Sequence, residues 1–133
     1  NEVHFAWLNT PKNNGGIEGV TYPILADTNR NLANILGILD IESTSYSEDT
    51  DSVIIEGSNV TYRATYLIDE TGKIFHESVN DMPLGRNVNE YLRMVDAYTH
   101  IQVKGEVCPA NWEAGKEAMN ADRKSTAEYL GTH

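Results

Sequence analysis

Two runs of alternating side chains stand out near the middle of the chain. Residues 62–69 place aromatic and apolar side chains at every second position, and residues 73–79 form a second run of similar length. The tetrapeptide Asp69-Glu70-Thr71-Gly72 lies between them and has the composition of a tight turn. The pattern predicts an antiparallel β-hairpin with one face on a core.

A helical period follows the predicted hairpin. Residues 80–85 break the alternation, and Asn87 with Glu90 three positions later resembles a capping box. The positions that follow are apolar at helical spacing: Val88, Tyr91, Leu92, Val95 and Tyr98. This spacing predicts an amphipathic helix of about three turns that packs on the sheet.

The first third of the chain is less regular. Residues 4–9 are mostly apolar and read as the end of a helix or strand, and the polar residues 12–19 read as a loop. Residues 22–26 form a short apolar run, which predicts a buried strand. A helix over 29–36 is then expected, with Asp27 or Thr28 as its cap and Gly37 as its stop.

Two segments lack a clear period. Residues 42–52 are rich in Ser, Thr, Asp and Glu, which predicts a solvated loop. Residues 100–133 carry few apolar side chains and read as an extended tail with helical propensity near 118–129. The order of elements indicates an α/β fold with a small mixed sheet of about three strands. That count is low, so we expect part of the sheet to lie outside this sequence.

Charge narrows the classes of partner. The 133 residues suit one domain and carry a net charge of −10, which opposes binding to nucleic acid and to anionic lipid. No apolar run approaches the roughly 18 residues that a membrane span needs. We therefore expect neither a nucleic-acid nor a membrane partner.

The single cysteine, Cys108, lies between Val107 and Pro109 in a polar stretch. One cysteine allows no intrachain disulfide, which excludes a disulfide-stapled secreted domain. Taken alone, Cys108 reads either as a small buried hydrophobic residue or as an accessible thiol that exchanges with a thiol outside these residues.

Two arginines have similar alternatives. Arg63 is either an exposed charge on a strand or a cation that lowers the pKa of a thiol and polarises a peroxide. Arg86 precedes a helix N-terminus, where a cation is unfavourable unless another group holds it. The four histidines lack metal-ligand spacing, and no glycine-rich phosphate loop precedes a helix, so we expect no metal and no cofactor.

Five ordered segments together resemble a known family. They are His4-Phe-Ala-Trp-Leu-Asn-Thr-Pro11 with Gly15-Gly16, Tyr22-Pro-Ile-Leu-Ala-Asp27, Tyr62-Arg-Ala-Thr-Tyr-Leu-Ile-Asp69, Val79-Asn-Asp-Met-Pro-Leu-Gly-Arg86 and Glu106-Val-Cys-Pro-Ala-Asn-Trp112. This series resembles the C-terminal portion of a typical two-cysteine peroxiredoxin. The resemblance covers nearly the whole chain.

The resemblance implies a thioredoxin-like fold of the peroxiredoxin type. The fold is expected to be incomplete in this chain, because the N-terminal strands and the helix with the peroxidatic cysteine precede the region matching His4. Residues 1–99 then correspond to the C-terminal part of the peroxiredoxin domain, and residues 100–133 to a C-terminal extension with the resolving cysteine. Residues 42–59 would be an insertion relative to the family.

The resemblance also implies a function and partners. Cys108 matches the resolving cysteine, Arg63 the arginine that activates thiolate and peroxide, and Arg86 a second arginine of the active site. The complete protein would be a thiol peroxidase that reduces hydrogen peroxide and alkyl hydroperoxides. Its partners would be a second subunit of a homodimer, further dimers of a decamer, and thioredoxin as reductant. The expected location is the cytoplasm.

Two other interpretations stay open. The chain alone is expected to be inactive, because it lacks the peroxidatic cysteine; it could instead be a non-catalytic thioredoxin-fold piece that acts by assembly or client binding. A secreted acidic binding module fits the glycosylation sequon at Asn59 but not the single cysteine.

Overall fold

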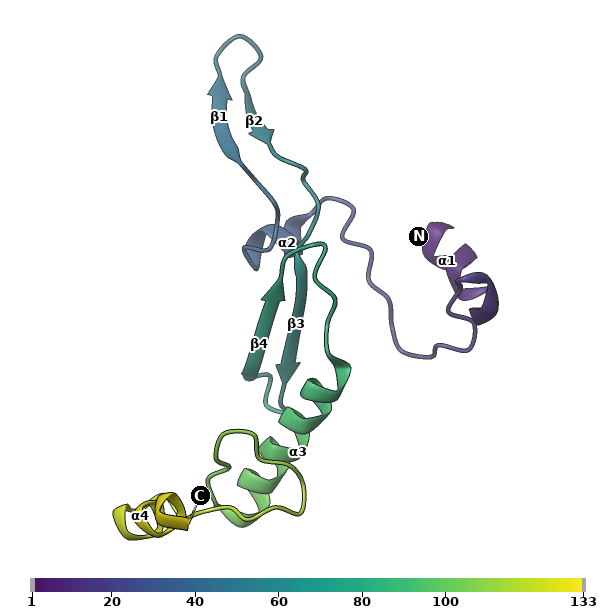
Figure 1. Ribbon diagram of the computed structural model, residues 1–133. Helices are drawn as coiled ribbons and strands as arrows, with labels where there is room; N and C mark the ends of the chain where they lie inside the picture. The colour runs from purple at the N-terminus through teal and green to yellow at the C-terminus, as the bar shows by residue number, and fades with distance from the viewer. Residues whose placement is uncertain (1, 133) are drawn as a thin grey trace. The chain divides into compact units, whose positions relative to one another are not determined.

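The computed structural model describes residues 2–132 of the chain (Figure 1). The chain divides into two compact units, which meet in sequence at Leu39 and Asp40. The first unit is mostly irregular with short helices, and the second contains two β-hairpins and two longer helices. None of the described helices is long and apolar enough to cross a membrane.

The first unit opens with helix α1, Glu2–Leu8, followed by the single 3-10 turn η1, Lys12–Asn14. The helix ends where polar side chains bind its free carbonyls: the hydroxyl of Thr10 donates to the Ala6 carbonyl at 2.8 Å. The sequence left helix and strand open for residues 4–9, and the structure shows a helix.

The predicted strand at 22–26 is wrong, since these residues form extended chain without strand pairing within the described part of the protein. Their apolar side chains are not buried: Tyr22 is 67% exposed and Leu25 is 78% exposed. A short apolar run shows that a segment suits a sheet interior, but a strand forms only where a neighbour takes its backbone hydrogen bonds.

Helix α2, Asn31–Ile35, is shorter than the predicted helix over 29–36. Asp27 supports it, as expected, although the residue at the cap position is Arg30. The two carboxylate oxygens of Asp27 accept the backbone N–H groups of Leu32 at 3.1 Å and Ala33 at 2.9 Å. Gly37 follows the helix with a φ of 65°, which glycine adopts without a steric penalty.

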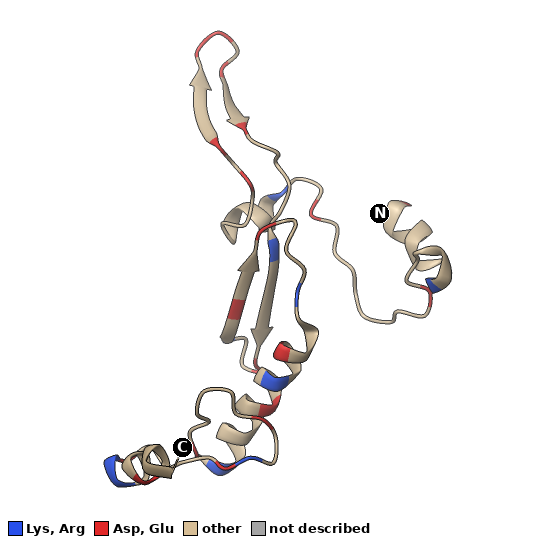
Figure 2. Cartoon of the chain, viewed as in Figure 1, with Lys and Arg blue, Asp and Glu red and all other residues tan. Residues whose placement is uncertain are grey.

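The second unit contains a hairpin where a loop was predicted. Strand β1, Ser43–Ser47, pairs antiparallel with strand β2, Ser52–Glu56. The loop prediction for 42–52 is wrong, because Thr44 and Tyr46 favour strands and lie opposite Ile55 and Val53 of the neighbouring strand. Residues 40–56 carry six acidic side chains and no lysine or arginine, so this hairpin is negatively charged (Figure 2).

The predicted hairpin over 62–79 is confirmed. Strand β3, Arg63–Ile68, pairs antiparallel with strand β4, Ile74–Asn80. Asp69 organises the turn, because its Oδ1 accepts the N–H groups of Thr71 and Lys73, each at 2.9 Å. The described residues contain two separate two-stranded sheets, rather than one sheet of about three strands.

Helix α3, Val88–Lys104, is the predicted amphipathic helix, extended by about one and a half turns. Asn87 caps the helix as predicted, since its Oδ1 accepts the N–H of Asn89 at 3.1 Å, but the predicted capping box is wrong because this bond comes from Asn89 and not from Glu90. Glu90 does not return to the cap; its carboxylate binds Arg93 instead. Gly105 ends the helix with a φ of 70°, the left-handed conformation that allows its N–H to reach the Ile101 carbonyl at 2.9 Å.

Helix α4, Arg123–Thr132, lies in the predicted tail and confirms its helical propensity near 118–129. Few side chains are buried in the described part of the chain: Ala33 in the first unit, and Ala97 and Trp112 in the second. The core of the second unit therefore centres on the contact between α3 and the segment that follows it.

Candidate functional site

The chain that follows helix α3 loops back beside that helix (Figure 1). It contains Cys108, whose thiol contacts the Ala97 carbonyl on α3. We call residues 105–119 the Cys108 segment. Its two ends are joined by a backbone bridge, in which Val107 N–H donates to the Met119 carbonyl at 2.7 Å and Met119 N–H donates to the Val107 carbonyl at 3.1 Å. The bridge makes this segment a closed loop rather than a free tail.

Trp112 anchors the Cys108 segment. Its side chain is 3% exposed, and its indole N–H donates to the Lys116 carbonyl at 3.1 Å. The indole contacts the ring of His100 on α3, with centroids 4.8 Å apart and planes tilted by 49°. Tilted ring contacts of this kind stabilise beyond the burial of apolar area.

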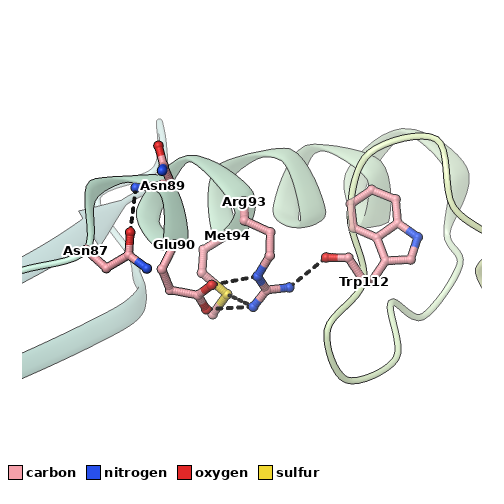
Figure 3. A network of polar contacts seen from close by, with 6 residues as sticks. All are labelled: Asn87, Asn89, Glu90, Arg93, Met94 and Trp112. Atoms are coloured by element: carbon pink, nitrogen blue, oxygen red, sulfur yellow. Dashed lines mark hydrogen bonds and ion pairs between the residues drawn. The ribbon is translucent and has the colours of Figure 1, made fainter.

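Arg93 on α3 binds the same segment (Figure 3). Its guanidinium donates to both carboxylate oxygens of Glu90, one turn earlier, and to the backbone carbonyl of Trp112 at 2.8 Å. The planar guanidinium provides several donors in a fixed geometry, so one side chain links the helix to the segment. A second link joins the His100 ring to the Glu106 carboxylate at 2.7 Å.

The thiol of Cys108 is partly exposed, which favours the interpretation as an accessible thiol over that of a buried hydrophobic residue. It faces α3, with its Sγ 3.7 Å from the Ala97 carbonyl. Burial raises the pKa of this thiol, the Glu106 carboxylate raises it further, and Arg93 opposes both. Cys108 is therefore mostly a thiol at neutral pH, and it suits attack on a positioned electrophile more than a role as the strong nucleophile.

The structure brings Arg63 and Arg86 to one end of the β3–β4 hairpin. Arg63 opens strand β3, and its Nε donates to the Met82 carbonyl at 2.6 Å. Arg86 donates from Nη1 to the Ala64 carbonyl at 3.2 Å, which explains how a cation is held just before a helix N-terminus. Among the described residues, both terminal nitrogens of Arg63 lack a hydrogen-bond partner, so they are free to bind an anionic or polar group.

Cys108 does not join these arginines. Its thiol contacts Ala97, and the next residue, Tyr98, donates its hydroxyl at 2.8 Å to Asp69 in the turn at the opposite end of β3. A six-residue strand such as β3 spans roughly 17 Å, at about 3.4 Å per residue. Within one copy of the chain, the thiol and the arginine pair therefore belong to different ends of the hairpin.

The cavity beside the hairpin turn does not join the three residues. A cavity of about 600 Å³ lies between the hairpin turn and α3, against the stacked rings of Phe75 and Tyr98, and none of Cys108, Arg63 and Arg86 lines it. The described residues include no group of three His, Cys, Asp or Glu side chains that could hold a metal ion.

The sequence did not reveal the contacts that hold the Cys108 segment. Arg93 follows Glu90 at the spacing of a helical ion pair, which signals the pair but not the bond to Trp112. The position of His100 in the sequence likewise gives no sign of its contacts with Glu106 and Trp112. The one available signal was Trp112, an aromatic side chain in a polar stretch, which indicates a local core.

Comparison with known proteins agrees with this arrangement. The family model described as AhpC/TSA family matches residues 1–77, and the model described as the C-terminal domain of 1-Cys peroxiredoxin matches residues 97–132. The second match includes the whole Cys108 segment. The two models together cover most of the sequence.

Individual relatives give the same result. The chain is 43% identical to the alkyl hydroperoxide reductase C of Helicobacter pylori strain ATCC 700392 / 26695, over 97% of this chain and 57% of that protein. It is 36% identical to peroxiredoxin 2 of Drosophila melanogaster, over 98% of this chain and 59% of that protein. The chain therefore spans less than two thirds of the length of these relatives.

A solved structure resembles the fold directly. The reduced 2-Cys peroxiredoxin of Plasmodium vivax matches with a TM-score of 0.76 and 35% identity, over 98% of this chain and 59% of that chain. This likeness confirms the thioredoxin-like fold of the peroxiredoxin type that the sequence motifs implied. The chain belongs to the AhpC/TSA family, and within it to the peroxiredoxins of the two-cysteine type.

Proposed function

We propose that this chain supplies the resolving thiol of a peroxidase that reduces hydrogen peroxide and alkyl hydroperoxides. Family membership together with one feature of the site supports the proposal: the only cysteine is a partly exposed thiol on a closed loop beside α3. Because the chain has no second cysteine, the thiol that attacks the peroxide must come from outside these residues.

The proposed chemistry has three steps. The outside thiol attacks the peroxide, forming a sulfenic acid and releasing water or an alcohol. The Cys108 sulfur then attacks the sulfenic sulfur, so that the S–O bond breaks, a disulfide forms and water leaves. A dithiol reductant of the thioredoxin class finally reduces the disulfide, becomes oxidised itself and restores both thiols.

The separation between Cys108 and the arginine pair supports a disulfide between subunits. Arg63 and Arg86 would hold the thiolate and the peroxide in one subunit, at the end of the hairpin remote from that subunit's own Cys108. The sulfenic acid would then meet Cys108 of a second copy. We accordingly propose a homodimer, with assembly into a decamer, and a reducing compartment such as the cytoplasm, where a free thiol persists.

The test is a Cys108→Ser variant of the complete protein. Sulfenic acid formation should keep its rate, whereas the intersubunit disulfide and thioredoxin-dependent turnover should be lost. Retained turnover would contradict the resolving role. The alternative function, a non-catalytic assembly or client-binding piece, predicts no disulfide at Cys108 in either protein.

A further inference from the structure

The β1–β2 hairpin has two unlike faces. Side chains that lie opposite each other in an antiparallel pair share one face of the sheet. Thr44 lies opposite Ile55, so these two share a face. Tyr46 lies opposite Val53 on that same face, two residues along each strand. The other face carries mainly serine side chains, so one face of this small sheet is apolar and the other is polar.

The apolar face has no cover in the described part of the chain. Tyr46 is 61% exposed, Val53 is 60% exposed and Ile55 is 47% exposed. Over residues 2–132, β1 and β2 pair only with each other, so the outer edge of each strand is also unpaired. An isolated two-stranded hairpin is only marginally stable in water, and a further strand or a packed partner stabilises it. The hairpin therefore offers a partner both an apolar face and a free strand edge.

Charge limits what can bind to this hairpin. Residues 40–56 contain six carboxylates, and none of them forms an ion pair with another described residue (Figure 2). Pairing of two hairpins from two copies would bring twelve carboxylates together, and like charges across a strand pair are destabilising. A partner that carries lysine or arginine is attracted instead.

We propose that strand β2, Ser52–Glu56, is a docking edge for an extended basic segment of another protein, which adds beside it as a third strand. β2 is the favoured edge because it carries Val53, Ile54 and Ile55, whereas β1 consists of serine, threonine and one tyrosine. In strand addition the main-chain hydrogen bonds provide affinity, and alternate side chains of the added strand provide specificity. This inference goes beyond the proposed peroxidase and does not depend on it.

The test uses the complete protein and a labelled synthetic peptide of three Lys-Val repeats, in which basic and apolar side chains alternate. Fluorescence anisotropy gives its Kd. A peptide of three Lys-Ser repeats keeps the charge without the apolar side chains, and a peptide of three Glu-Val repeats reverses the charge. We expect each control peptide to bind at least roughly tenfold more weakly.

Two results with these peptides would overturn the proposal. Equal binding of the Lys-Ser peptide would mean that charge alone attracts the peptides, without the apolar face. No binding of the Lys-Val peptide would mean that another part of the complete protein covers the hairpin.

Two variants test where the Lys-Val peptide binds. Val53→Thr together with Ile55→Thr keeps β-branched side chains in the strand but reduces its apolar surface, so binding should weaken by roughly tenfold. A second variant neutralises three carboxylates outside the strands: Glu42→Gln, Glu48→Gln and Asp49→Asn. It should weaken binding by a similar factor and make the Kd less dependent on salt.

The matched control for the second variant removes the same number of charges from exposed positions outside the hairpin: Glu18→Gln, Glu70→Gln and Glu117→Gln. This control should keep the Kd within about twofold of the unaltered protein, because exposed charges farther apart than a Debye length are screened. If it weakens binding as much as the hairpin variant does, the net charge of the protein attracts the peptide and the proposal fails.

Amide hydrogen exchange distinguishes strand addition from other modes of binding. The Lys-Val peptide should raise the protection of amides in residues 52–56, and binding without that change would refute the added strand. If the threonine variant loses the pairing of β1 and β2 before peptide is added, the charge variant, which leaves both strands unaltered, decides the location. If instead the threonine variant keeps its hairpin and sediments as a smaller assembly than the unaltered protein, a second copy occupies β2 and the proposal is overturned.

Discussion

Replacing Trp112 tests whether the contact between the Cys108 segment and α3 forms the core of the second unit. Its indole is 3% exposed, donates a hydrogen bond to the Lys116 carbonyl and contacts His100. Trp112→Ala removes all three interactions, and truncation of a buried tryptophan costs about 3–5 kcal/mol of the free energy of unfolding. Trp112→Phe keeps most of the apolar contact, so the lost hydrogen bond and reduced contact should cost about 1–2 kcal/mol.

The assay is urea unfolding followed by far-ultraviolet circular dichroism, with pulse alkylation of Cys108 as a local probe of the same unit. Trp7→Phe is the matched control, because Trp7 belongs to the other unit and is 46% exposed. We expect Trp7→Phe to leave the exposure of Cys108 to alkylation unchanged at every urea concentration. If Trp112→Ala costs less than about 1 kcal/mol, the burial of this side chain does not hold the segment in place.

Three further predictions concern other parts of the second unit. Arg63→Ala in the complete protein should raise the barrier of sulfenic acid formation by about 2–4 kcal/mol, measured by stopped-flow kinetics; an unchanged rate would remove Arg63 from the active site. Hydrogen bonds from Thr71 chiefly, then from Tyr98 and Lys73, lower the pKa of Asp69 in the folded chain below its ordinary value of 3.8. The stability that the ionised Asp69 provides is therefore complete above about pH 3.8 and falls as the solution is acidified further. Asp69→Asn should lack this part of the acid dependence in urea titrations. Gly105→Ala places a Cβ at a φ of 70° and should cost about 1 kcal/mol, and equal stability by urea unfolding would show that α3 ends in another way.

The elements that the sequence predicted correctly depend on local signals. The alternation around Tyr66 and the Asp69–Gly72 turn define β3 and β4 by themselves, since strands joined by a tight turn find their partners nearby. The apolar spacing from Val88 defines α3 in the same way. This hairpin and α3 position both arginines and support Cys108.

The predictions that were wrong concern segments whose structure depends on a pairing partner or whose composition hides the strand formers. Residues 22–26 have the composition of a buried strand, yet Leu25 is 78% exposed. An apolar run shows that a segment suits a sheet interior, but it does not specify a neighbouring strand to pair with. The β1–β2 hairpin was missed because serine and acidic residues outnumber the strand formers. Its strands still pair, and its turn is supported by the Tyr46 hydroxyl, which donates to Asp51.

The candidate site was predicted only in part. Motifs identified Cys108, Arg63 and Arg86 as residue types with the right chemistry, and their catalytic roles remain predictions. The contacts that hold Cys108 were not predictable, because the bond from Arg93 to the Trp112 carbonyl joins residues 19 positions apart through backbone and leaves no pattern of side chains. Such contacts depend on how the segment turns back on α3.

The central claim is that Cys108 resolves a sulfenic acid formed outside these residues. Its most direct test is peptide mapping under non-reducing conditions, on the complete protein after brief treatment with peroxide. The account predicts that the peptide containing Cys108 is linked by a disulfide to a cysteine absent from the 133 residues, and that the link joins two subunits. A free Cys108 thiol in protein that has consumed peroxide would contradict the claim.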